Sequence, residues 1–160
     1  MTLIEAFRTQ SKACANLGSP FMERLCGLLA ERLPEEGPVW EKIRGWPGDV
    51  SPYGDSVPLR LAGALHGLVR ASMVPALNAV YPPHHEAVSD DDLLDAVCKA
   101  ATDEADFILE RLKRAPQTNE VRRAGILLPG FFEIVRQTGL NEFVTSELGA
   151  SAGLNLYWDH

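Results

Sequence analysis

Apolar residues recur at intervals of three and four along most of this chain, which is the spacing of amphipathic α-helices. The pattern predicts helices over 2–17, 20–33, 38–44, 57–73, 75–81, 89–114 and 121–138. Turn residues separate them, and Gly18 and Gly139 each stand where a helix should end. The expected fold class is therefore mainly α, a multi-helix bundle.

For three of these helices the sequence predicts more than their position. The helix over 57–73 has the broadest apolar surface, with Arg60 and Arg70 elsewhere around it, so we place it at the centre of the bundle. The helix over 89–114 should be long and continuous, with Ser89 as its N-cap and acidic residues in its first turn. Pro129-Gly130 should kink or interrupt the helix that follows.

Residues 45–56 form the longest stretch without helical spacing before the C-terminus. The stretch contains three glycines and two prolines, with Trp46 and Tyr53 among them, which predicts an ordered loop. Two interpretations remain open for it. The loop either faces a ligand or is a connection pinned to the core by its aromatic residues, and the second is favoured.

Composition bounds the class of protein. The chain has 160 residues, 46% of them hydrophobic and 23% charged, as expected for one soluble domain with a real core. A net charge of -7 argues against binding to nucleic acid or to an acidic membrane, because both require a basic surface. Three cysteines in apolar helical patterns are expected to be reduced thiols, and no apolar run is long enough to span a membrane. We expect a cytoplasmic protein.

One polar cluster has the residue types of a metal site. It consists of His84-His85-Glu86 followed by Asp90-Asp91-Asp92. Adjacent histidines on a loop do not converge on one ion, and no second pair of histidines or cysteines supplies further ligands. We therefore expect no metal site. The aspartates are better explained as residues that complement the positive end of a helix.

The C-terminal stretch 142–156 is the place where residue type and spacing together indicate chemistry. Phe143 to Leu148 is typical of a short strand, and small residues with Gly149 and Gly153 follow it before a helix begins at about Ala152. Glu147 would place a carboxylate at the end of the strand. Such a strand, glycine turn and helix N-terminus can hold a nucleotide-like molecule.

Several stretches together resemble a bacterial family catalogued as domain of unknown function 2332. The resemblance spans most of the chain. It is carried by Gly48-Asp49, Gly54-Asp55, the run from Val57 to His66, Pro116-Gln117-Thr118-Asn119-Glu120-Val121, Leu127-Leu128-Pro129-Gly130, and Glu147-Leu148-Gly149-Ala150-Ser151-Ala152-Gly153-Leu154-Asn155-Leu156.

The resemblance implies a relation to S-adenosylmethionine-dependent methyltransferases. Gly149, Ala150 and Gly153 would then form the turn beside the cofactor, and Glu147 would orient that turn or meet the amino-acid end of the cofactor. Ser151 stands where many methyltransferases have another glycine. The expected domains are a helical domain over 1–140 and, over 141–160, the stump of a Rossmann-like cofactor-binding domain.

Gln117 and Asn119 carry amide groups that suit a cofactor carboxylate, although capping of the next helix is the favoured explanation for them. A site of this class also needs an acidic residue roughly 20 positions after the glycine turn. The printed sequence stops before that position, so we expect these residues to bind no cofactor and to catalyse nothing alone. S-adenosylmethionine is expected only in a longer chain.

The alternative is a helical interaction module without catalysis. In this interpretation the apolar C-terminal segment docks on a second copy and forms a homodimer. A hydrolase is disfavoured, because the chain has no Gly-x-Ser-x-Gly motif and no nucleophile suitably spaced from a histidine. The residues that would form the docking surface are Phe143, Val144, Leu148, Leu154, Leu156, Tyr157 and Trp158.

Overall fold

The structure is a computed structural model that describes residues 1–116, 122–149 and 156. It divides into two compact units, Met1–Pro116 and Gln117–His160. The predicted residues Gln117, Asn119, Ala150 and Gly153 lie outside the described part of the chain.

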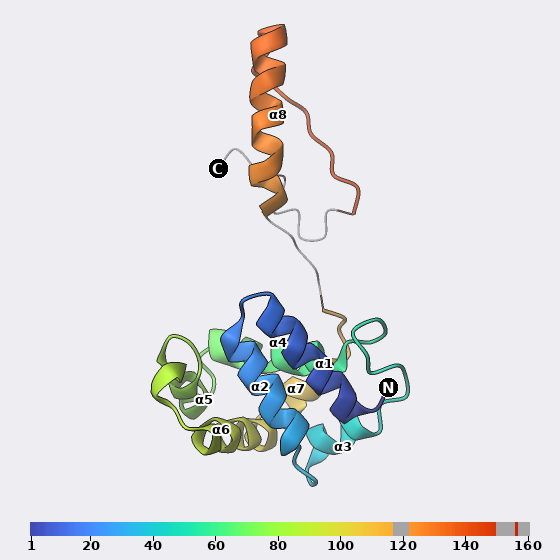
Figure 1. Cartoon of the computed structure of the whole chain (residues 1–160), viewed down its shortest axis with the longest axis vertical. Coiled ribbons are helices and arrows are strands. Elements are labelled where there is room, and N and C mark those ends of the chain that lie inside the picture. The colour runs from blue at the N-terminus through green and yellow to red at the C-terminus, as the bar shows by residue number, and fades with distance from the viewer. Residues whose placement is uncertain (117–121, 150–155, 157–160) are drawn as a thin grey trace. The chain divides into compact units, whose positions relative to one another are not determined.

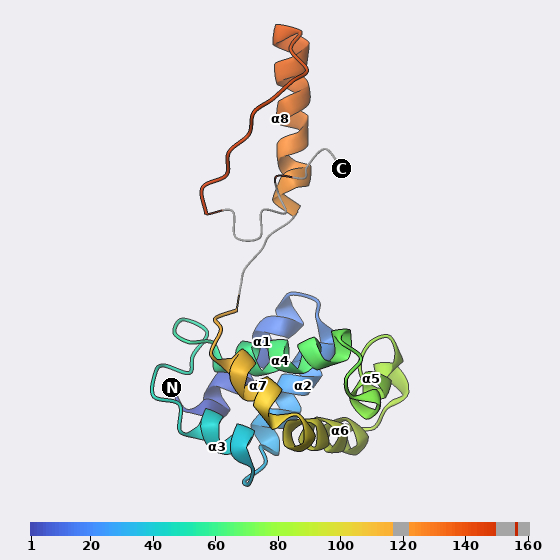
Figure 2. The same cartoon turned by 180° about the vertical axis from the view of Figure 1, so that it is seen from behind.

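The first unit consists of helices joined by turns and by one longer loop over 45–56, which confirms the mainly α fold class (Figures 1 and 2). Helices α1 and α2 form an antiparallel hairpin, and α4 packs against α1, α5 and α7. The elements are α1 (Leu3–Asn16), α2 (Pro20–Glu31), α3 (Pro38–Arg44), α4 (Val57–Arg70), α5 (Pro75–Val80), the 3-10 helix η1 (His84–Ala87), α6 (Asp90–Asp103) and α7 (Ala105–Leu112).

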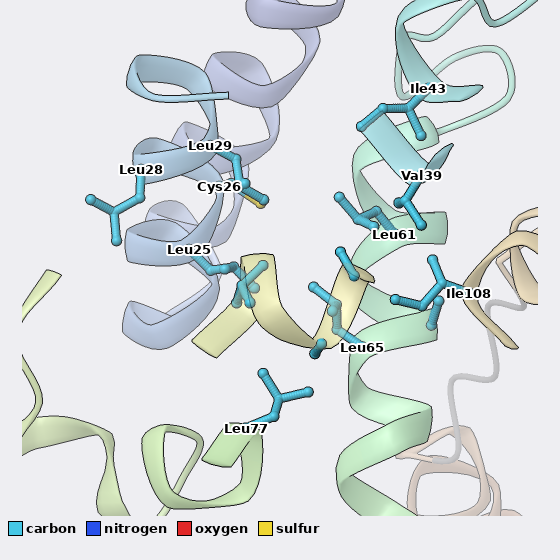
Figure 3. Packing of buried hydrophobic residues seen from close by; sticks show 14 of the residues in the cluster. Leu25, Cys26, Leu28, Leu29, Val39, Ile43, Leu61, Leu65, Leu77 and Ile108 are labelled. Carbon is cyan, nitrogen blue, oxygen red and sulfur yellow. The ribbon is translucent and has the colours of Figure 1, made fainter. Parts of the chain in front are cut away.

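The core of this unit is built from aliphatic and aromatic side chains of different helices, and Figure 3 labels aliphatic residues and Cys26 among them. Leu61 and Leu65 of α4 lie in its middle and are fully buried, as are Ile43 of α3 and Ile108 of α7. Full burial of one such side chain stabilises the fold by about 2 to 3 kcal/mol. The central position predicted for the helix that begins at Val57 is therefore confirmed.

Helix starts follow local side-chain chemistry where a cap can form. The Thr2 hydroxyl accepts a hydrogen bond from the backbone N–H of Glu5, and the Glu5 carboxylate accepts one from the Thr2 backbone N–H. Ser89 likewise accepts from the Asp92 backbone N–H at 3.1 Å and caps α6 as predicted. Ser19, at the start of α2, makes no such bond.

The single long helix predicted over 89–114 is wrong, because the chain turns at Glu104 between α6 and α7. One straight helix would carry Glu104 on the same face as Val97 and Ile108, both of which are fully buried. A carboxylate buried there without a partner would be destabilising. The turn leaves Glu104 half-buried and lets α7 pack against α3 and α4.

The second unit contains α8 (Arg122–Thr138), which runs through Pro129 without interruption. The proline removes one backbone N–H, and its ring would crowd the carbonyl of Gly125. Both residues lie on an exposed side of the helix, while Phe131 and Val135 beyond them pack inward. Of the two expected effects, the interruption does not occur, and the kink stays a prediction. Gly139 ends the helix as predicted, with a left-handed φ of 71°.

Residues 140–147 follow α8 as a non-helical segment and turn at Leu148-Gly149. No strand forms within 122–149, so the predicted strand over 143–148 is not supported. A strand requires a neighbouring backbone for its hydrogen bonds, and here the segment's neighbour is a helix. The Phe143 ring contacts the Phe131 ring of α8 edge to face, with 5.4 Å between their centroids.

Candidate functional site

The loop between α3 and α4 is organised around two aspartates. Asp49 accepts hydrogen bonds from the backbone N–H and the hydroxyl of Ser51, at 2.9 and 2.8 Å. These bonds, the backbone one first, lower the pKa of Asp49. Asp55 accepts a hydrogen bond from the Trp46 indole Nε1 at 2.8 Å. The loop is therefore held by charged acceptors rather than by apolar packing alone.

Arg60, in the first turns of α4, connects this loop to the end of α7. Its Nε donates to the backbone carbonyl of Asp55 at 2.6 Å, and its Nη1 donates to the carbonyl of Leu112 at 3.1 Å. The guanidinium carbon also lies 5.4 Å from the centre of the Trp46 ring. One side chain thus joins a loop, the start of one helix and the end of another.

These contacts refine the sequence prediction for the loop. Trp46 is pinned as the favoured interpretation requires, whereas Tyr53 is 93% exposed and pins nothing. Arg60 was expected on the polar side of its helix, yet its side chain is only 9% exposed. Sequence reasoning missed this role; the available signal was an arginine one turn after a loop that contains two aspartates and a tryptophan.

Two glycines allow the loop to close tightly. A Cβ added to Gly48 would overlap the Asp55 carboxylate, and a Cβ on Gly54 would lie 2.6 Å from the Asp49 carbonyl oxygen. Neither glycine has a left-handed φ, so close approach is the reason for glycine at both positions. The aspartates and glycines of the loop therefore act as one structural group.

The predicted cofactor turn is described only at Glu147 and Gly149. Gly149 has a left-handed φ of 69°, and among the described residues a Cβ there would meet no atom within 4 Å. Its backbone conformation therefore favours glycine, and no described residue fills the space beside it. Glu147 is half-buried two residues earlier. The positions of Gln117, Asn119, Ala150 and Gly153 relative to this turn are not described.

Along the extended segment, side chains that face α8 alternate with side chains that are exposed. Phe143, Thr145 and Glu147 are half-buried, whereas Val144, Ser146 and Leu148 are exposed. This period of two is the side-chain pattern of a β-strand. The segment thus has strand-like alternation, with one side on a helix and the other side open.

Among the described residues, no group of three or more histidine, cysteine, aspartate or glutamate side chains could hold a metal ion. In the cluster that the sequence singled out, Asp90 pairs with Arg24 at 2.7 Å and Asp91 pairs with Arg32 at 2.6 Å. Its aspartates thus connect α6 to the α2 region. None of the helices searched in the described ranges is long and apolar enough to cross a bilayer.

Comparisons with known proteins give one match. A protein-family profile described as "Uncharacterized protein conserved in bacteria (DUF2332)" matches residues 4–160. Searches of curated proteins and of solved structures found no match. Because the profile covers nearly the whole chain, this protein belongs to the bacterial DUF2332 family.

Proposed function

We propose that this chain is the helical N-terminal portion of an S-adenosylmethionine-dependent methyltransferase-like protein. One observation carries the proposal: a segment with strand-like alternation packs on α8, presents Glu147 near its end, and turns at Gly149 in a left-handed conformation. This is the order of acidic residue and glycine that the resemblance to methyltransferases implies where the first strand leads into the cofactor turn. The segment would become a paired strand when neighbouring strands are present.

The burial pattern supports an interior strand. Phe143 faces α8, and Val144 and Leu148 on the opposite side are fully exposed in the described structure. Strands of parallel sheets are covered on both faces, so they carry apolar residues on both. A single helix covers one face only. The outward Val144 and Leu148 would therefore lie under a second layer in a complete α/β domain.

The described residues fit part of a cofactor turn. No atom of the described residues fills the space that a side chain at Gly149 would take, which would let a ligand approach its backbone. Glu147 would orient the turn or accept hydrogen bonds from the amino group of the ligand. Gln117, Asn119, Ala150 and Gly153 are the further residues we assign to this site. The cofactor itself would supply the methyl group.

Calorimetry of the protein expressed from its whole reading frame tests this proposal. S-adenosylmethionine should bind, and Gly149→Ala should weaken binding about tenfold or more, because alanine disfavours the left-handed conformation. Gly139→Ala is the matched control, since Gly139 also has a left-handed φ and open space around it but ends α8. Absence of binding, or equal loss in both variants, would contradict the proposal.

The second candidate function is self-association through the C-terminal unit. It is favoured by the large hydrophobic side chains that are exposed in that unit. Isolated exposed residues of this kind are common, so the support lies in their number within one short unit. The residues are Ile126, Leu127, Phe132, Ile134, Leu140, Val144 and Leu148.

A further inference from the structure

We draw no further inference here: the strongest candidate, the exposed apolar flank of α8 that carries Leu127 and Ile134, is an unpartnered face, and nothing in the described part of the chain shows what covers it.

Discussion

The Nη1 of Arg60 donates a hydrogen bond to the backbone carbonyl of Leu112 at 3.1 Å, across 52 positions of sequence. Leu112 is the last residue of α7, where helix carbonyls lack intrahelical partners. The guanidinium therefore caps one helix from the start of another. It also holds the Asp55 carbonyl and covers the Trp46 ring.

Arg60→Ala should lower the free energy of unfolding by about 2 to 4 kcal/mol, because it removes a largely buried cation and leaves its partners unpaired. Urea unfolding followed by circular dichroism measures this change. Arg70→Ala is the control on the same helix, since Arg70 is exposed, and it should change stability by less than about 0.5 kcal/mol. Equal effects of the two substitutions would contradict the assigned role.

Two glycine-to-alanine substitutions should act in opposite directions. Gly48→Ala should destabilise the protein by about 1 to 3 kcal/mol, because its methyl group would displace the Asp55 carboxylate from Trp46. Gly63→Ala, on an exposed face of α4 with no atom near the added Cβ, should stabilise it by about 0.5 to 1 kcal/mol. Thermal unfolding of both variants checks the signs, and a neutral Gly48→Ala would disprove the tight closure of the loop.

The three cysteines should differ in reactivity. Burial, and then the nearby Cys14, raises the pKa of the Cys26 thiol to about 12, so almost none of it is thiolate at pH 8. Cys98 is half-buried and also has a raised pKa, from burial and from Asp95. A thiol reagent at pH 8 should modify Cys98 first and reach Cys14 and Cys26 only after unfolding. Rapid reaction of more than one thiol in the folded protein would contradict this order.

Glu133 should titrate well below a free glutamate. Hydrogen bonds from Arg136 and then from Gln137 lower its pKa from 4.5 to about 2. Because the folded pKa is the lower one, the stability that this carboxylate contributes to α8 is present above about pH 4.5 and is lost as the pH falls toward 2. Carbon-detected NMR titration measures the midpoint. Arg136→Gln should return it toward 4.5, and a midpoint near 4.5 in the unmodified chain would rule out these bonds.

Helix positions were largely predictable because local spacing and end signals determine them. The apolar pattern of 57–73, Gly18 and Gly139 as stops, and Ser89 as a cap were all confirmed. The error at Glu104, and the absence of an interruption at Pro129, occurred where local rules conflict with packing. In one case the core excludes a carboxylate from a continuous helix, and in the other a helix continues through a proline on its exposed side.

The candidate site was predictable only in part. The glycine that needs a left-handed φ at position 149 was identified by residue type and spacing alone. The strand that should precede it was not supported, because strand formation depends on a neighbouring backbone that sequence pattern does not supply. Its side-chain alternation is nevertheless strand-like, since period-two burial depends only on an extended backbone that is covered on one side.

The sequence by itself determined the class of fold, the place of most helices and the family, because each depends on residue patterns that are local or directly comparable. Tertiary structure alone decided that Arg60 is buried between Trp46, Asp55 and Leu112, and that α6 and α7 are separate helices. These outcomes depend on which side chains meet across distant positions. Such contacts arise from the packing of whole helices, which no local pattern specifies.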